Sequence, residues 1–534
     1  MFTSTSLEIG FVALFGASFF VGIWYAFPMV NTVTDVWALG GGVLRALEAH
    51  SLLPGSDVSY GVVSFYLNYL FTLPALGIGW MLSGFDIAAL KTAFIFHPEY
   101  SLIVPRLTSV FAALMLLVVM YRFLKVHVTS AWWRVALLVL ACGNVLAILL
   151  ARSGKMWMLS VLLVVLSFIF LTRALSEEAP RGMPGRLSAL SILTAFLATA
   201  NALFTAVFLV TIPVLLYAFR RNTRALVRIV WMSFGGAFAC FVFLALNAHN
   251  TLDLLSGFLA PLFGGASGAL HELSFVEAFF INARHAVEAF PLLLIALVPA
   301  LFAGIRNKPL AFLALLYGAL YLVAISVVFR SDHGLALNVR HVFPIGFFLL
   351  FLITAYASPR RWIAAFLFSI GLGIYGYTVF LLSVPATYNA AADFIALNYG
   401  MRDIRIDEGV FEFTLPMNKA SYRLFADEHC GSTCQYRQTL NTDIALRPLV
   451  VTGETNPAVL DLLPPPTLAV VEHAIPACTP LARFGNDVPD DGIFDIDINL
   501  GRMVIPSFYT LRQLGKNIYL YDAASCLPLK SGLF

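Results

Sequence analysis

The sequence predicts a polytopic α-helical membrane protein with about 11 spans plus interfacial helices, and a small α/β domain at its C-terminus. Of the 534 residues, 60% are hydrophobic and 12% are charged. A soluble domain has about 45–50% apolar and about 25% charged residues. Apolar runs as long as a membrane span recur up to residue 384. This composition excludes a disordered chain, a nucleic-acid-binding arm and an ordinary cytosolic enzyme.

Charge divides the chain into two predicted domains. Residues 1–384 carry 22 Lys/Arg against 13 Asp/Glu, and residues 385–534 carry 11 Lys/Arg against 17 Asp/Glu. The first part is basic and apolar, whereas the second is acidic, polar and rich in turns. We therefore expect a transmembrane domain over 1–384 and an extracytoplasmic domain over 385–534.

The first apolar run, residues 9–30, is predicted to be a retained span. It is longer than a signal-peptide core and lacks a basic leader and a clear cleavage site. An amphipathic stretch from Asp35 to about Ser51 follows and is expected on the outer surface. Further runs are long enough to span a bilayer core, which needs about 20 apolar residues. They are residues 104–121, 133–151, 156–172, 187–201, 202–219, 229–247, 286–305, 309–329, 342–357 and 362–383.

Residues 61–83 leave two alternatives open, because they are also apolar enough to span. A span here would force the N-terminus outside. Asn68, Pro74 and two glycines interrupt the run, and Tyr66 and Tyr69 suit the membrane interface. We predict a helix that lies in the membrane plane or re-enters it.

Positive charge orients the spans, because cytoplasmic loops are enriched in Lys and Arg. Basic residues recur in alternate loops, which we place in the cytoplasm. The chain after the last span, including the acidic domain, is then outside. These basic residues are Arg122, Lys125, Arg134, Arg173, Arg181, Arg186, Arg220, Arg221, Arg224, Arg228, Arg306, Lys308, Arg360 and Arg361.

The C-terminal part changes in pattern. Strand-like runs appear at 446–453, 467–474 and 517–523, and helical patterns at 387–398 and 507–515. Strands mixed with helices over this length are typical of one small α/β domain.

Cysteine usage fits an external position for this domain. An even number of cysteines in an oxidising compartment predicts disulfides, and four cysteines allow three pairings. We predict Cys430–Cys434 and Cys478–Cys526. A zinc site is disfavoured, because no second close pair accompanies the first.

Ionisable residues at the membrane edge are costly, so each one suggests a function. Asp35 either caps the amphipathic helix or takes part in chemistry, and the two roles are compatible. Arg152 and Lys155 lie between two spans on the predicted outer side, against the positive-inside bias. They are either snorkelling side chains or ligands for an anion such as a lipid phosphate.

A short external loop concentrates further charge. It is either a solvated loop or an anion-binding rim at the level of the lipid headgroups. Arg284 and His285 lie similarly, just before another span. The charged residues of the loop are Arg330, Asp332, His333, Arg340 and His341.

The sequence carries no strong cofactor signal. The acidic run at 486–499 lacks the spacing of an EF-hand, so no metal site is predicted there. Motifs for nucleotide-driven pumping or dinucleotide binding are absent from the sequence. No cofactor is firmly implied, although a divalent metal is compatible with the pattern.

The order of these features resembles the polytopic GT-C glycosyltransferases, in particular the protein mannosyltransferase and aminoarabinose transferase superfamily. An acid (Asp35) follows the first span, and an interfacial helix follows the aromatic stretch Ser59–Leu70. An arginine-leucine-x-serine run opens the next span, a basic-basic-proline pattern opens a late one, and an external domain closes the chain. The residues of these two runs are Arg106, Leu107, Ser109, Arg340, His341 and Pro344.

The resemblance implies sugar transfer from a polyprenyl-phosphate donor to a glycan, lipid or protein acceptor on the outer face of the membrane. It implies that Asp35 is the catalytic base. Many members carry a second acid in the next external loop, where this chain has Arg-Ser-Gly-Lys at 152–155. We predict donor-phosphate contacts from Arg152, Lys155, Arg330, His333, Arg340 and His341, and substrate contacts from Tyr60, Tyr66, Arg284 and His285.

One base is chemically sufficient for this reaction. A polyprenyl phosphate leaves as a stabilised anion, so the site needs cations for the phosphate and one base for the acceptor. Direct displacement inverts the anomeric centre. The alternatives are a transporter or flippase for a lipid-linked saccharide and a non-catalytic membrane scaffold. A bacterial inner membrane with the C-terminal domain in the periplasm is the simplest location, and no nucleic-acid partner is expected.

Overall fold

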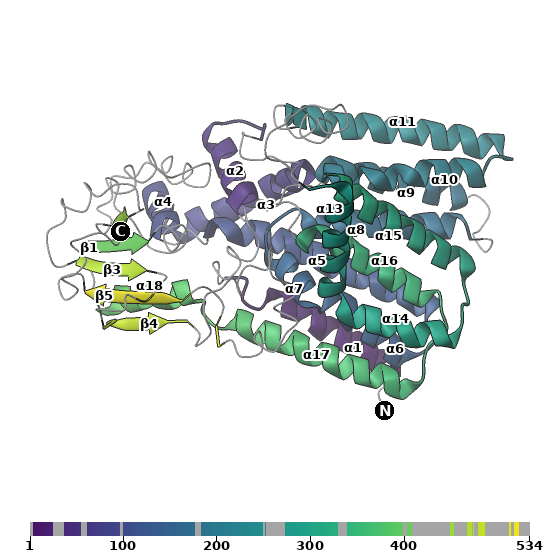
Figure 1. Ribbon diagram of the computed structural model, residues 1–534. Coiled ribbons are helices and arrows are strands. Elements are labelled where there is room, and N and C mark those ends of the chain that lie inside the picture. The colour runs from purple at the N-terminus through teal and green to yellow at the C-terminus, as the bar shows by residue number, and fades with distance from the viewer. Residues whose placement is uncertain are drawn as a thin grey trace.

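The computed structural model describes most of the helical part of the chain and short pieces of the C-terminal part (Figure 1). The long helices run side by side, and the strands lie together at one end of the bundle. The described residues are 4–24, 37–54, 61–96, 100–176, 183–248, 251–252, 273–328, 339–398, 403–407, 449–452, 467–471, 474, 479–485, 512–513 and 517–522.

Helices account for nearly all of the described chain before residue 399. The elements are α1 (Ser4–Ala17), η1 (Ser18–Phe20), α2 (Trp37–Glu48), α3 (Val62–Leu82), α4 (Ile87–Phe96), α5 (Tyr100–His127), α6 (Ala131–Cys142), α7 (Val145–Arg152), α8 (Trp157–Ala174), α9 (Met183–Asn201), η3 (Leu203–Val210), α10 (Thr211–Ala218), α11 (Thr223–Ala245), α13 (Phe275–Ala289), α14 (Pro291–Ala303), α15 (Lys308–Val328), η5 (Val339–Val342), α16 (Phe343–Thr354), α17 (Arg361–Ser383) and α18 (Thr387–Asn398).

Several of these helices can cross a bilayer. Within the described residues, six are long and apolar enough by length and composition, namely α3, α5, α8, α11, α15 and α17. The number rises to eight if each of two bent helix pairs counts as one span. The chain is therefore a multi-pass membrane protein, and about 11 spans stays a prediction. The membrane placement of α3 also stays open, because its length and composition suit a span.

Two predicted spans are broken in the structure. The run 133–151 forms α6 and α7, which are bent by 60°. The break is built by Asn144, whose side chain accepts a hydrogen bond from Ala147 N at 2.7 Å and donates one to Ala141 O at 3.0 Å. One side chain thus satisfies the end of one helix and the start of the next, where backbone groups lack partners within a helix.

The second broken span corrects the prediction over 286–305. Helix α13 continues to Ala289, and α14 starts at Pro291 after a bend of 83°. Proline suits the first position of a helix, because its missing N–H would have no partner there. Ser274 and Glu277 form a capping box at the start of α13. Helix α13 consequently runs across the direction of the long helices (Figure 1).

A buried ion pair ties the first helix to the bundle near the predicted cytoplasmic end. Glu8 accepts a hydrogen bond from Arg134 Nη2 at 2.6 Å and one from Tyr121 Oη at 3.3 Å. Arg134 Nη1 donates in addition to two backbone carbonyls at 2.8 and 3.0 Å. The charges are therefore paired and hydrogen-bonded, as burial requires. This arrangement joins α1, α5 and α6.

Close helix packing at Gly236 provides a test of the bundle. A Cβ added to Gly236 of α11 would clash with the Phe196 ring of α9. We expect Gly236→Ala to destabilise the protein by about 1–3 kcal/mol, because overpacking forces the two helices apart. The neighbouring Gly235→Ala is the matched control, since its added Cβ would meet nothing within 4 Å. Thermal unfolding in nanodiscs measures both variants, and equal midpoints would contradict the packing.

The C-terminal part contributes five described strands in one sheet, in the order β2-β1-β3-β5-β4. β1 pairs in parallel with β2 and β3, and β5 pairs antiparallel with β3 and β4. Helix α18 packs against β4 and β5. Its bounds agree with the predicted helix over 387–398. The strands are β1 (Asp403–Asp407), β2 (Leu449–Thr452), β3 (Thr467–Val471), β4 (Ala482–Phe484) and β5 (Ile518–Asp522).

Three strands lie inside the predicted runs, whereas β1 and β4 were not predicted. The alternation in these two short segments is too brief to stand out without their neighbours. The predicted cysteine pairs, Cys430–Cys434 and Cys478–Cys526, lie outside the described residues. The same is true of the acidic run at 486–499 and of most of the predicted helix at 507–515.

Candidate functional site

A buried group of cationic side chains lies at the end of the bundle predicted to face outside. Its members are Lys155, His285, Arg340 and His341, and each is only 4% exposed. Lys155 precedes α8, His285 belongs to α13, and Arg340 and His341 belong to η5. We call these four residues the cationic cluster. Burying this much basic character requires anionic or polar compensation.

The cluster is organised around Trp157. The guanidinium carbon of Arg340 lies 5.8 Å from the centre of the Trp157 ring, and the His341 ring lies 5.2 Å from it, edge to face. Lys155 and His285 are close enough to interact electrostatically with His341. Three segments far apart in the sequence therefore meet at one place.

Aromatic packing fixes the position of His341. Tyr321 Oη donates a hydrogen bond to the His341 carbonyl at 2.8 Å. The Phe204 ring lies 5.9 Å from the His341 ring and stacks on Trp157 at 5.2 Å. These contacts come from α15, η3 and α8, so the backbone of η5 is held from several sides. The His341 ring is therefore held in one position by its neighbours.

A tight turn places Lys155. Gly154 has φ +73°, a left-handed conformation that favours glycine. A Cβ at this position would also lie 3.0 Å from Pro105 Cβ and 3.3 Å from Arg106 N. Ser109 Oγ donates a hydrogen bond to the Lys155 carbonyl at 3.0 Å. The turn is therefore pressed against α5, and Lys155 has little freedom to move.

Two buried arginines hold the end of the first helix. Arg152 Nε donates to Val21 O at 2.8 Å, and its Nη2 donates to Ser18 O at 2.7 Å. Arg106 Nη1 donates to Ile23 O at 3.0 Å. Carbonyl groups at the C-terminal end of a helix lack partners and carry partial negative charge, so cations suit them. This geometry favours a structural role for Arg152, although we predicted a phosphate contact.

A stability measurement tests the role of Arg152. We expect Arg152→Met to destabilise the protein by about 2–4 kcal/mol, because it leaves buried carbonyls without their charged donor. Thermal unfolding in nanodiscs, with and without polyprenyl phosphate, measures both the stability of the variant and its binding of the phosphate. A normal unfolding midpoint combined with weakened phosphate binding would show instead that Arg152 serves the ligand.

The α2–α3 pair is anchored at the same corner. Gly61, the N-cap of α3, lies between α2 and the start of α8. A Cβ built on it would be 3.1 Å from Met156 Cβ and 3.7 Å from Leu39 Cδ2. Asn201 accepts a hydrogen bond from Ser64 N at 2.9 Å and donates one to Met156 O at 3.2 Å. Leu39 of α2 and Met156, the residue after Lys155, therefore both lie against Gly61.

The remaining predicted site residues lie either outside the described part of the chain or away from the cluster. Asp35, Tyr60, Arg330 and His333 lie outside the described residues. Arg284 stays away from the cluster, since its side chain is 78% exposed and binds Glu288 Oε1 at 2.7 Å.

Tyr66 of α3 is also separate from the cluster. Its ring lies 5.2 Å from Phe65 and 6.2 Å from Phe243 of α11. Its hydroxyl is buried, without a hydrogen bond in the described part of the chain.

No function was predicted from the sequence for four residues of this region. Arg106 was noted only as part of a run, and Trp157, Asn201 and Glu288 were not singled out. An arginine and an asparagine inside apolar runs are a usable signal, because polar groups at membrane depth need partners. Trp157 carries no such signal, since tryptophan is common near the membrane interface.

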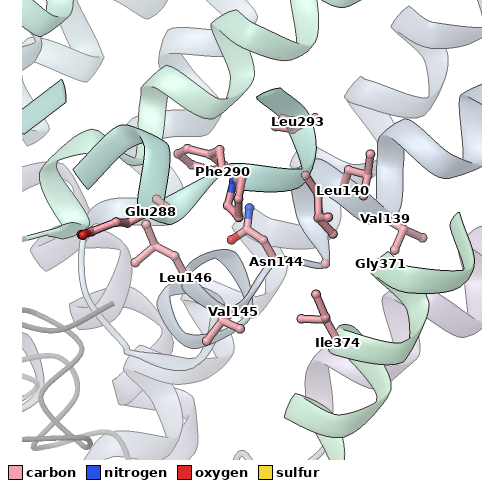
Figure 2. Close-up of a pocket in the computed structure, with 14 residues that line it drawn as sticks. Val139, Leu140, Asn144, Val145, Leu146, Glu288, Phe290, Leu293, Gly371 and Ile374 are labelled. Atoms are coloured by element: carbon pink, nitrogen blue, oxygen red, sulfur yellow. The ribbon is translucent and has the colours of Figure 1, made fainter. Parts of the chain in front are cut away.

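A mostly apolar pocket lies where the two helix breaks face each other (Figure 2). Its empty volume is about 530 Å³, including space open to solvent. Asn144 and Glu288 are its polar residues, and α17 closes one side through Gly371 and Ile374. Within the described residues, no group of three or more His, Cys, Asp or Glu side chains could hold a metal ion.

Comparisons with known proteins give one similarity. No family model matches the chain, and no curated protein matches it. Among solved structures, it is similar to the crystal structure of ArnT from Cupriavidus metallidurans bound to undecaprenyl phosphate. The similarity covers 96% of this chain and 98% of that one, with a TM-score of 0.45 and 12% sequence identity.

Proposed function

We propose that the protein is an integral-membrane glycosyltransferase that moves a sugar from a polyprenyl-phosphate donor to an acceptor at the outer face. The cationic cluster carries this proposal. Buried cations at the end of an apolar bundle suit one class of ligand well, namely a phosphate attached to a lipid, since the anion offsets their charge and the chain remains in an apolar environment. The resemblance to the GT-C transferases supplies the sugar transfer.

The proposed roles follow from chemistry and position. Lys155 and Arg340 hold the donor phosphate, and Asp35 accepts the proton of the acceptor hydroxyl or amine. As the bond between the anomeric carbon and the phosphate oxygen breaks, its electron pair stays on the phosphate. The pre-organised cations stabilise that developing charge. A single displacement inverts the anomeric centre.

A lipid-linked saccharide transporter is the second candidate. The two helix breaks that meet at the pocket favour it, because discontinuous helices at substrate sites are typical of secondary transporters. This candidate would use the same cations but would need no base.

The deciding experiment offers a panel of polyprenyl-phosphate sugars to the purified protein in sealed proteoliposomes. We expect release of polyprenyl phosphate and an inverted glycoside when a suitable acceptor is supplied. Intact donor appearing in the opposite leaflet would support the transporter. A product that retains its anomeric configuration would exclude single displacement. The absence of both transfer and movement with every donor would contradict both candidates.

A further inference from the structure

Glu288 is a carboxylate beside the cationic cluster to which the proposed mechanism gives no role. It lies on the last turn of α13, and its side chain is 18% exposed. One carboxylate oxygen, Oε1, accepts a hydrogen bond from Arg284 Nε at 2.7 Å. The other, Oε2, lies 3.4 Å from Nδ1 of His285. The carboxylate therefore bridges an exposed guanidinium and a buried imidazole.

The second nitrogen of His285 faces away from Glu288. Nε2 lies on the opposite edge of the ring from Nδ1, is buried, and makes no hydrogen bond within the described part of the chain. His285 interacts electrostatically with His341, so its ring lies at the cluster. A buried ring nitrogen without a partner is costly, which indicates that a ligand group completes its hydrogen bonding.

We propose that Glu288 is a positioning residue: it fixes His285 through Nδ1 so that Nε2–H points to the lipid-linked phosphate. This inference rests on the proposed function, because it assigns the phosphate as the ligand of the cluster. A carboxylate behind an imidazole sets the ring orientation and stabilises the imidazolium. Burial lowers the pKa of His285, so its ring takes up the second proton when the phosphate binds and shares that proton with the phosphate.

The hydrogen bond from His285 stabilises the released polyprenyl phosphate more than it stabilises the donor. During transfer the acceptor atom forms a bond to the anomeric carbon, and the bond from that carbon to the phosphate oxygen breaks. The acceptor proton goes to Asp35, and the electron pair goes to the phosphate. The donor phosphodiester carries one negative charge, and the released monoester gains a second. His285 keeps its own proton and donates a hydrogen bond to this charge.

Burial explains why a carboxylate is needed. His285 interacts with His341 of η5, and Arg340 and Lys155 act in turn on His341. Burial lowers the pKa of the His285 imidazole, because a charge removed from water is costly. Within α13, Arg284 also lowers this pKa and Glu288 raises it. Among the described residues that act on His285, Glu288 is the group that favours its protonated form.

Binding of a polyprenyl monophosphate to the full-length protein in nanodiscs tests the proposal, because it requires no sugar transfer. We expect wild-type affinity to fall as the pH rises and His285 becomes neutral. In Glu288→Gln this fall should occur at a lower pH, because the carboxylate no longer favours the protonated ring, with affinity near neutral pH reduced about 10-fold. A polyprenyl phosphodiester, with less charge, should lose less affinity.

Two further variants keep the test specific. Glu277→Gln is the matched control, since Glu277 is an exposed glutamate on the same helix, and it should follow wild type. In a His285→Gln background, Glu288→Gln should have no further effect. A wild-type pH profile in Glu288→Gln, or an equal effect in both backgrounds, would overturn the inference.

The binding test also separates this inference from the proposed function. A wild-type protein that binds the monophosphate with the expected pH shift, yet transfers no sugar from any donor, would support the role of Glu288 and contradict transfer. A protein that transfers sugar, but whose pH profile of phosphate binding is unchanged in Glu288→Gln, would support transfer and contradict the role of Glu288. Failure of wild type to bind any polyprenyl phosphate would overturn the inference outright.

Discussion

Asp35→Asn is expected to lower sugar transfer by about 10²–10⁴-fold, with donor binding nearly unchanged. The variant keeps the size and hydrogen-bonding ability of the side chain but removes its ability to take a proton. Asparagine also caps helices well, so any capping of α2 is retained. Single-turnover kinetics with a bound polyprenyl-phosphate sugar measures the chemical step directly.

The control for Asp35 is Asp86→Asn. Asp86 is exposed before α4 and accepts a hydrogen bond from Ala88 N at 2.8 Å, which asparagine can also accept. This variant should transfer sugar at the wild-type rate. A stably folded Asp35→Asn protein with full turnover would remove Asp35 from the mechanism and leave the base unidentified.

The spans were predictable where an apolar run forms one uninterrupted helix. Helices α8, α15 and α17 follow the predicted runs closely, because length and apolarity determine a membrane helix, whereas α5 extends beyond the run 104–121 at both ends. The two breaks were not predictable, since hydropathy does not distinguish a straight helix from a bent one. The run 133–151 stays apolar through Gly143 and Asn144, although the Asn144 side chain ends one helix and starts another there.

The residues of the candidate site could be selected by type from the sequence, but their arrangement could not. Lys155, Arg340, His341 and His285 were selected because charge at the membrane edge is costly, and they do lie together. The same argument selected Arg152, whose described hydrogen bonds all go to backbone carbonyls. Charge alone cannot separate a cation that binds a helix end from one that binds a ligand, because both meet negative charge.

The second large effect is expected at Arg340. Arg340→Gln should lower transfer by about 10²–10³-fold, the loss typical of removing one pre-organised donor from a charge-stabilising site. Arg340 is 4% exposed and lies over Trp157. Bulk water therefore has little access to take over its hydrogen bonds in the variant. Arg340→Lys should give an intermediate loss, because lysine keeps the charge but lacks the planar group that stacks on an aromatic ring and binds phosphate through two bonds.

Arg360→Gln is the control for Arg340, since Arg360 is exposed at the start of α17 in a predicted cytoplasmic loop. It should transfer sugar normally. Because Arg340 would hold phosphate in a transferase and in a transporter alike, loss of donor binding in Arg340→Gln cannot by itself decide between them. The comparison with Asp35→Asn does: a transferase loses chemistry in both variants, whereas a transporter is impaired only when the cation is removed. A protein unaffected by Arg340→Gln would contradict phosphate binding at the cluster.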